Sequence, residues 1–332
     1  MKDLIKDKVI LVTGGTGSIG SQLVLELLKH EPKQVRVLSR DEGRQHDLVH
    51  LTGRPTNLRL FIGDIRDKER LERALSGVDI VFHAAAMKYV PLCEYNPFEA
   101  VKTNIIGSQN LIDAALACGV EKVVAISTDK VANPVGVMGV SKLMMEKLFI
   151  NANYYKGDAK TIFSCVRFGN VTWARGSVLA HWQRQATELG VISITDENMT
   201  RFMMSRSDAV TLVLEALSQM RGGEIFVFKM PAVKIKELAV MFLEKYFPDG
   251  EVKIQKTGRR AGEKLHEELI GTVTSADHIF ENDRMFIIRP DLNIYGFDIY
   301  PAVDYIDFSK RDAPDEYSSE DHLDAEKIKA II

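Results

Sequence analysis

Short apolar runs alternate with longer amphipathic stretches through the first half of the chain. The apolar runs occupy residues 8–13, 34–38, 58–65, 78–86, 123–126 and 163–168. Their length and their richness in Val, Ile and Leu are typical of strands that are buried on both faces. Segments of helical composition lie between them, at residues 21–29, 98–116 and 140–154. This alternation predicts an α/β fold with a doubly wound parallel sheet and right-handed crossovers.

The pattern changes after about residue 170, which predicts a second unit. Helical patterns at residues 178–189, 207–220, 232–247 and 265–269 now mix with strand-like runs at 192–195, 225–228 and 252–255. We expect residues 171–200 and 231–310 to form a smaller α/β domain, in which 274–309 make a β-rich cap. Residues 200–230 are expected to return to the first domain, residues 1–170. A tail, 311–332, begins acidic and polar and ends in a short helix near 323–331; it packs on a neighbour or is mobile.

Composition indicates an ordinary soluble globular protein. The 332 residues are 45% apolar and 27% charged, with a net charge of −3. The interspersed charges argue against nucleic-acid binding, and no apolar run approaches the ~20 residues of a membrane span. The cysteines, Cys93, Cys118 and Cys165, have no paired spacing, which predicts reduced thiols rather than disulfides or a metal site. The charged start lacks the apolar core of a secretory signal, so the expected location is the cytoplasm.

A glycine-rich loop directly follows the first apolar run and opens the first helix. Its glycines allow a tight turn, a close backbone approach to a pyrophosphate and close packing of helix on strand. The helix N-terminus adds a partial positive charge. An ordinary glycine-rich turn is the alternative, but this context predicts a dinucleotide site and a Rossmann-type first domain. The loop residues expected to contact the cofactor are Gly14, Thr16, Gly17, Ser18, Ile19 and Gly20.

The end of the second strand bears on the choice of cofactor. Asp41 lies roughly 20 residues past the loop, at the distance where an acid accepts hydrogen bonds from the adenosine ribose. Arg40 suits a 2′-phosphate instead, and Ser39 and Arg44 could add donors. NADP is therefore favoured over NAD, although Arg40 could also be a solvated surface arginine.

Further cofactor contacts are expected where the next strands end. Asp64, beside Ile65, either caps the following helix or accepts from the adenine amino group. The small side chains of 84–86 would let the backbone lie close to the cofactor. Asn104 is a further candidate, or only a structural hydrogen-bonder. The remaining residues assigned to the cofactor are Ile65, Ala84, Ala85, Ala86, Lys88 and Lys142.

A polar stretch, residues 127–142, follows the apolar run 123–126. It brings Thr128, Asp129 and Lys130 to the end of a predicted parallel strand, where open α/β enzymes carry their chemistry. A Pro/Gly loop comes next, and a helix then carries Met138 and Lys142 on one face. The alternatives are an exposed Asp129–Lys130 ion pair and a plain surface lysine at position 142.

By these motifs the chain resembles the extended short-chain dehydrogenases/reductases. Within that superfamily it is similar to the UDP-N-acetylglucosamine 4,6-dehydratases of the polysaccharide-biosynthesis group. The segments that carry the resemblance are 14–20, 39–42, 83–88, 127–130, 167–171, 199–202 and 262–264, and they span the chain to about residue 270. In one respect the chain departs from the superfamily, because Met138 replaces the usual tyrosine of a Tyr-x-x-x-Lys pair. Methionine cannot take a proton, so the residue that replaces tyrosine as the first base is left open.

The resemblance implies a redox-neutral dehydration of a UDP-N-acetylhexosamine. Hydride leaves C4 for NADP⁺, the C5 proton and the C6 hydroxyl depart, and the hydride returns to C6, with possible inversion at C5. In this scheme Lys130 is the C5 base, an amine whose pKa is lowered by burial and by positive charge such as that of Lys142. Asp129 is the carboxyl that protonates the departing hydroxyl, and Thr128 contacts O4. Lys142 hydrogen-bonds the nicotinamide ribose.

The same resemblance supplies candidates for the nucleotide-sugar site. Cationic side chains suit the diphosphate and a carboxylate suits a ribose diol. The residues expected there are Lys88, Met138, Asn170, Arg175, Ser177, Val178, Arg201, Arg259 and Glu263. Each arginine could instead be solvated.

Two other functions remain open at this point. A 4-epimerase or reductase of the same fold would have no use for the Asp129–Lys130 pair, and a silent NADP-binding interaction protein would have lost catalysis with the tyrosine. The resemblance also implies a homo-oligomer, a dimer or a hexamer.

Overall fold

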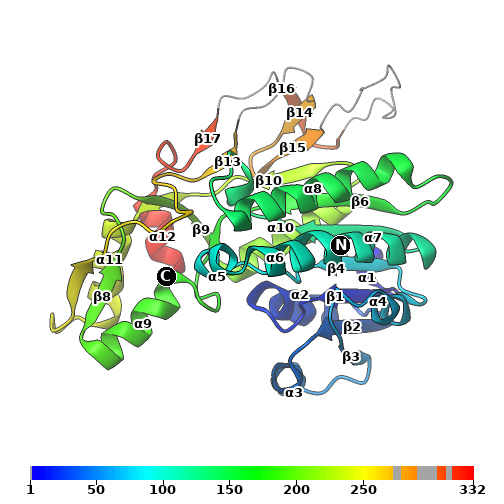
Figure 1. Ribbon diagram of the computed structural model, residues 1–332, viewed down its shortest axis with the longest axis horizontal. Coiled ribbons are helices and arrows are strands. Elements are labelled where there is room, and N and C mark those ends of the chain that lie inside the picture. Colours follow the sequence, from blue (N-terminus) through cyan, green and yellow to red (C-terminus); the bar gives the residue numbers. More distant parts are fainter. Residues whose placement is uncertain (1, 272–277, 290–304, 312–315) are drawn as a thin grey trace.

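A ten-stranded sheet forms the centre of the computed structural model, which describes residues 2–271, 278–289, 305–311 and 316–332 (Figure 1). The strand order is β16-β14-β15-β10-β6-β5-β4-β1-β2-β3, and the segment from β3 to β10 is parallel throughout. The parallel strands are β1 (Val9–Thr13), β2 (Gln34–Ser39), β3 (Leu58–Ile62), β4 (Ile80–His83), β5 (Lys122–Ile126), β6 (Ile162–Arg167) and β10 (Ile225–Phe228). The predicted doubly wound parallel sheet is confirmed.

The helices that flank this sheet form two groups, and within each group the helices contact one another. One group pairs α2 (Ser18–Leu28) with α10 (Arg206–Gln219), and the other joins α4 (Lys68–Leu75), α7 (Gly107–Ala117) and α8 (Val137–Tyr155). The shorter elements near them are α1 (Lys2–Ile5), α3 (Glu42–Leu51), α5 (Val90–Tyr95), α6 (Pro97–Ala100), the π-helical turn η1 (Val101–Ile106) and the 3₁₀ turn η2 (Asp129–Val131). The central strands β1, β4, β5, β6 and β10 are buried between these helices, as in other parallel sheets, whereas the edge strand β3 is largely exposed.

A second unit lies at the carboxyl end of the main sheet, on the left of Figure 1. Its strands are β7 (Asn170–Val171), β9 (Thr200–Met204) and β11 (Ala232–Lys234) in one sheet, and β8 (Val191–Ile194) with β12 (Lys253–Lys256) in another. Its helices are α9 (Val178–Leu189), α11 (Ile235–Tyr246) and α12 (Ala325–Ile331). Trp182, Phe242 and Ile328 are fully buried in a core separate from that of the main sheet.

Two expectations for the C-terminal part were wrong. Residues 265–269 are not helical; instead β13 (Glu268–Ile270) pairs with β17 (Tyr317–Ser318), because so short a helix gains little and a strand partner is at hand. The described part of 274–309 is not a separate cap. Its strands β14 (His278–Glu281) and β15 (Met285–Arg289), with β16 (Ser309–Arg311), continue the main sheet: β15 pairs antiparallel with β10, β14 with β15, and β16 with β14. Within the described tail, α12 packs against α11 of its own chain.

A buried ion pair ties the main sheet to the segment that carries β13. Arg167, at the end of β6, donates to Glu146 of α8 through Nε at 2.8 Å and through Nη2 at 2.7 Å. Its Nη1 also donates to the carbonyl of Leu269 in β13 at 3.3 Å. Since Glu146 is only 1% exposed, its charge depends on this guanidinium for compensation.

Arg167→Met should therefore lower the free energy of unfolding by about 3–5 kcal/mol, the usual cost of leaving a buried charge uncompensated. Urea denaturation followed by circular dichroism measures this change. The double variant Glu146→Gln/Arg167→Met removes both charges and should lose much less stability. A double variant as unstable as the single one would contradict this account.

Candidate active site

The candidate site lies where four neighbouring parallel strands end. The glycine loop follows β1, residues 84–86 follow β4, η2 follows β5, and Asn170 comes just after β6. These strands are adjacent in the sheet and run the same way, so their carboxyl ends meet at one edge. This edge is the usual ligand-binding position of an open α/β sheet.

The glycine loop forms a cradle with little room for side chains. Gly14 has a positive φ of +66°, and a Cβ there would lie 2.7 Å from the backbone nitrogen of Ala85. The backbone of 84–86 therefore lies against the loop. Gly17 precedes α2 and provides no side-chain cap for its first turn, which leaves the helix N-terminus to another acceptor. These features fit a pyrophosphate group.

At the end of β2, some of the residues expected to bind the ribose and the 2′-phosphate form hydrogen bonds and ion pairs among themselves. Asp41 caps α3, accepting from the backbone nitrogen of Arg44 at 3.0 Å, and the Arg44 Nε lies 3.1 Å from the same carboxylate. Arg40 is largely exposed, and its Nη1 lies 3.8 Å from Asp64 Oδ2. Ser39 Oγ accepts from Gln45. Two guanidinium groups thus lie beside the strand end.

One of the two interpretations of Asp64 was wrong. The cap of α4 is Asp67, which accepts from the backbone nitrogen of Arg70. Asp64 lies ahead of that helix and accepts from the backbone nitrogen of Arg66 at 3.0 Å and from its guanidinium at 2.7 Å. A contact between Asp64 and adenine stays a prediction.

Asp129 and Lys130 form a buried pair rather than an exposed one. Asp129 has no exposed surface, and its Oδ1 accepts from Thr128 Oγ1 at 2.8 Å and from Lys130 Nζ at 2.9 Å. Lys130 Nζ also lies 3.5 Å from Asn170 Oδ1 and 3.3 Å from Glu267 Oε1. The alternative of a solvated loop ion pair is therefore wrong.

The expected direction of the Lys130 pKa was also wrong. Burial by itself lowers the pKa of this amine, but the negative charges of Asp129 and Glu267 outweigh burial and raise it. Arg201 opposes them, and Lys142 is not among the charges that act on Lys130. No sequence pattern places Glu267 here, because it comes from a segment far along the chain.

Lys142 is buried too, but its environment differs. It is only 5% exposed, and its Nζ donates to the carbonyl of Ile126 at 2.6 Å and lies 3.0 Å from Met145 Sδ. Since no carboxylate is bonded to its amine, burial lowers the pKa of Lys142 to about 8. Met138, one turn earlier on α8, packs with Cys93 and Ala100. A plain surface lysine at position 142 is thus excluded.

Two other predicted residues hold the loops near the strand ends. Asn104 exchanges hydrogen bonds with the backbone of Met87 at 2.8 and 2.9 Å and donates to Ser141 Oγ at 3.0 Å. These contacts favour the interpretation of Asn104 as a structural residue. Lys88 Nζ lies 3.3 Å from the carbonyl of Arg175, and burial together with the charge of Arg175 lowers the pKa of Lys88.

The backbone of Arg175 joins the glycine loop to the second unit. Its nitrogen donates to Ser18 Oγ at 2.7 Å, and its carbonyl accepts from Tyr89 Oη at 3.2 Å. A ligand held by the glycine loop would therefore lie next to the loop that leads into α9.

A cavity of about 500 Å³ opens in the second unit beside this junction. A volume of this size suits a small organic ligand. The predicted residues that line it are Asn170, Val178, Arg201 and Glu263; those that do not are Lys88, Met138, Arg175, Ser177 and Arg259. The wall residues that the sequence did not single out include His181, Arg184, Thr195 and Arg260. Asn170 lines this cavity and also contacts Lys130, so the Asp129–Lys130 pair lies at its edge.

The two adjacent arginines of the basic turn, Arg259 and Arg260, have different surroundings. Arg260 lines the cavity, whereas Arg259 Nε lies 3.8 Å from Asp196 and is more than half exposed. The composition of the turn predicted a cation here, but the two adjacent arginines point to different surroundings. Only the path of the turn distinguishes them.

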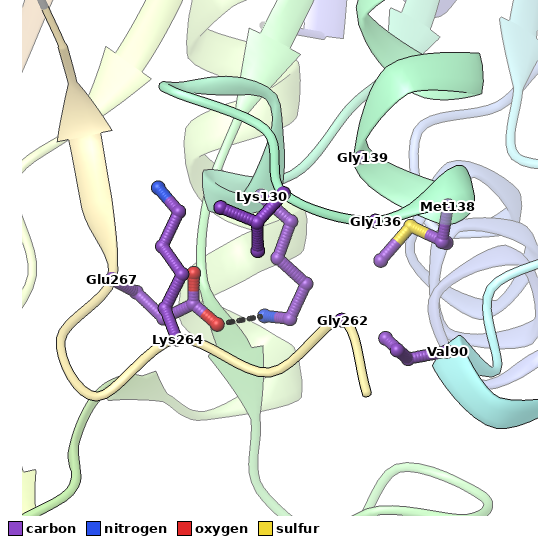
Figure 2. A pocket seen from close by; sticks show the side chains of 9 residues that line it. Val90, Lys130, Gly136, Met138, Gly139, Gly262, Lys264 and Glu267 are labelled. Carbon is purple, nitrogen blue, oxygen red and sulfur yellow. Dashed lines mark ion pairs between the residues drawn. The ribbon is translucent and has the colours of Figure 1, made fainter. Parts of the chain in front are cut away.

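A second, much smaller cavity of about 10 Å³, near the volume that one water needs, lies next to the pair. Figure 2 shows Lys130 extending toward Glu267, with Met138 and Gly262 on the other side. Amine, carboxylates and hydroxyl thus meet beside a ligand-sized cavity. Such a set can remove and deliver protons.

Comparison with known protein families gives one match over most of the chain. The model of the family described as polysaccharide biosynthesis protein matches residues 10–290.

Curated relatives carry three kinds of names. A protein of Methanocaldococcus jannaschii named as an uncharacterized membrane protein is 48% identical over 100% of this chain and 97% of its own length. In the described part of the present chain, no helix has the length and apolarity needed to cross a membrane. A UDP-N-acetylglucosamine 4,6-dehydratase (inverting) of Campylobacter jejuni is 44% identical over 89% of this chain and 86% of its own. A UDP-glucose 4-epimerase of Rickettsia conorii is 37% identical over 98% and 95%.

Solved structures support the same fold. Pen from Bacillus thuringiensis superposes with a TM-score of 0.91 at 40% identity, over 99% of this chain and 98% of that one. MoeE5 in complex with UDP-glucose and NAD gives a TM-score of 0.65 at 25% identity, over 76% and 86%.

The low pKa of Lys142 is directly testable. In the protein without ligand, the 13Cε signal of one lysine should titrate near pH 8, so that its amine is largely neutral above that pH. Lysine-selective 13C NMR measures this titration, and the signal should be missing from Lys142→Met. A midpoint at or above the ordinary lysine value of about 10.4 would show that burial does not act as described.

Proposed function

Because the chain belongs to the polysaccharide biosynthesis protein family, we propose that it is a nucleotide-sugar 4,6-dehydratase that acts on UDP-N-acetylglucosamine with NADP. The product is a UDP-4-keto-6-deoxy sugar, with C5 inverted as in the name of the Campylobacter relative. Such a product suits the synthesis of surface polysaccharide.

The observation that carries this proposal is the buried Asp129–Lys130 pair at the edge of the cavity. Its ions are 2.9 Å apart, and Asn170 connects Lys130 to the cavity wall. An epimerase needs only to remove and return hydride at C4, and it has no use for a separate acid and base at C5 and C6. The pair therefore favours the dehydratase over the epimerase.

The cofactor assignment depends on the glycine cradle and on the end of β2. Arg40 and Arg44 both lie beside that strand end, and a 2′-phosphate suits two guanidinium groups better than a bare ribose does. A nicotinamide cofactor held by the glycine cradle would supply the hydride chemistry, as acceptor from C4 of the sugar and donor to C6. Lys142 donates to its ribose from the floor of the site.

The proton steps use the Asp129–Lys130 pair as a unit. In a low-dielectric site, transfer of one proton from the ammonium to the carboxylate gives a neutral amine and a neutral acid together. Lys130 then removes the C5 proton, which a ketone at C4 has made acidic, and Asp129 protonates the departing C6 hydroxyl. The O4 proton, relayed through Thr128, restores the acid form of Asp129. A proton from solvent completes C5 on the face opposite Lys130 as hydride reaches C6, and Lys130 releases the proton it took to solvent. Thr128, which donates to the same carboxylate, contacts O4.

The uridine diphosphate occupies the 500 Å³ cavity. Arg201 and Arg260 supply positive charge in its wall, and Glu263 suits a ribose diol. Tyr89 lies between this cavity and the glycine loop, where the sugar joins the diphosphate.

Incubation with UDP-N-acetylglucosamine should give a product lighter by one water. Mass spectrometry detects this loss, and NMR of the product reports the configuration at C5. Inversion at C4 with unchanged mass would contradict the dehydratase proposal and favour the epimerase named among the relatives.

Lys130→Ala should lose turnover by about 10²–10⁴-fold, the usual contribution of a general base, while it keeps cofactor binding. Lys236→Ala, a surface change, serves as its control.

The adjacent arginines provide a matched test of the cavity. Arg260→Gln should weaken UDP binding by roughly 10-fold or more, since a hydrogen bond to a charged group contributes about 1.5–3 kcal/mol. Arg259→Gln makes the same chemical change outside the cavity wall and should bind UDP within about twofold of the parent protein. Isothermal titration calorimetry measures both, and equal losses in the two variants would argue against this cavity as the nucleotide site.

A further inference from the structure

Glu267 is a buried carboxylate that faces the candidate base. Only 2% of its side chain is exposed, and its Oε1 lies 3.3 Å from Lys130 Nζ and 3.8 Å from Arg201 Nε (Figure 2). Its other oxygen, Oε2, is buried and has no hydrogen-bond partner among the described residues. Burying a carboxylate is costly, and within the described part of the chain the side chain of this one is compensated by ionic contacts alone.

The backbone of Glu267 is fixed by segments from distant parts of the chain. Its nitrogen donates to Ser319 Oγ at 2.9 Å, and its carbonyl accepts from the nitrogen of Ser319 at 2.8 Å. Ser319 Oγ in turn lies 2.6 Å from Thr200 Oγ1 of β9. The C-terminal segment and β9 therefore fix the backbone of Glu267 beside Lys130.

Two carboxylates lie near the amine of Lys130, one from its own loop and the other from a separate segment. Asp129 bonds it at 2.9 Å and Glu267 faces it at 3.3 Å. A lysine side chain has several rotatable bonds, and a single partner adjacent in sequence leaves it much freedom. The second carboxylate restricts the ammonium group to the edge of the cavity, within reach of Asn170.

We propose that Glu267 is a positioning residue, which with Asp129 holds the Lys130 ammonium group at the edge of the substrate cavity. This inference rests on the proposed function only in taking Lys130 as the base. The charged groups that face Lys130 are Asp129, Glu267 and Arg201, and those that face Glu267 include Lys264 as well. Glu267 contributes through Lys130 and does not itself touch the substrate.

The charge of Glu267 also sets the protonation of Lys130. Its carboxylate favours the ammonium form, in agreement with the raised pKa of Lys130. Glu267→Gln keeps the shape and removes the charge, so a larger fraction of Lys130 should be neutral at any pH below its midpoint. Each unit by which the pKa falls increases that fraction about tenfold.

Trace labelling with acetic anhydride tests this without substrate. At pH 9, the Lys130 peptide of Glu267→Gln should be acetylated about tenfold faster than in the parent protein, relative to the exposed Lys236. Mass spectrometry of the peptides gives both rates. Lys130 is accessible enough for this reagent, since 23% of its side chain is exposed.

Glu268→Gln is the matched control. It makes the same change one residue later, where the carboxylate lies 3.7 Å from Lys264 rather than near Lys130. Acetylation of Lys130 should stay within about twofold of the parent rate in this variant. Should Glu267→Gln not fold, Glu267→Asp keeps the charge but withdraws it by one carbon, and it should give a smaller increase. A parental Lys130 rate in every folded Glu267 variant overturns the proposal.

The pH dependence of kcat/KM relates the labelling of Lys130 to turnover. If the chain dehydrates its substrate, the alkaline limb of kcat/KM should move to lower pH in Glu267→Gln, because the Asp129–Lys130 pair, which holds one proton in its active form, loses that proton more readily once the negative charge of Glu267 is gone. An unmoved limb with faster labelling would show that Glu267 positions Lys130 but that Lys130 is not the base, which overturns the proposed role of Lys130 alone.

Discussion

The ammonium group of Lys130 is the charge around which the site is organised. It lies at the end of β5 beside Asp129, which is fully buried, and a charge in such a place must find partners. Those partners come from separate parts of the chain: Asp129 from the same turn, Asn170 from the end of β6, and Glu267 from the segment before β13. The compensation of one buried charge thus joins the parallel sheet to the second unit. The C-terminal segment takes part through Ser319, which fixes the backbone of Glu267.

The two lysines of the stretch 127–142 show how burial and partners compete. Both are largely withdrawn from solvent. Lys130 has two carboxylates near its amine and its pKa is raised, whereas Lys142 donates to a carbonyl and its pKa falls to about 8. From the sequence we expected the lowered pKa at Lys130. The expectation failed because desolvation, anticipated from the strand-end position, is outweighed by the charge of Asp129 next to it and by that of Glu267, which the sequence could not place there.

The loop at 172–178 matters for a similar reason. The backbone of Arg175 bonds to Ser18 of the glycine loop and to Tyr89 on the other side. It therefore brings the cofactor cradle and the large cavity into one continuous site. A hydride donor in the cradle and a sugar in the cavity would meet where Lys130 and Asn170 lie.

The sequence by itself determined the parallel sheet, the glycine cradle and the Asp129–Lys130 pair. Each of these depends on local information: periodicity, spacing and the order of strand, loop and helix. Tertiary structure alone decided that Glu267 faces Lys130, that Arg260 rather than Arg259 lines the cavity, and that residues 268–270 pair with the tail instead of forming a helix. Those features arise from contacts between residues far apart in the chain. No local pattern records such contacts, because their partners are chosen by the packing of the whole fold.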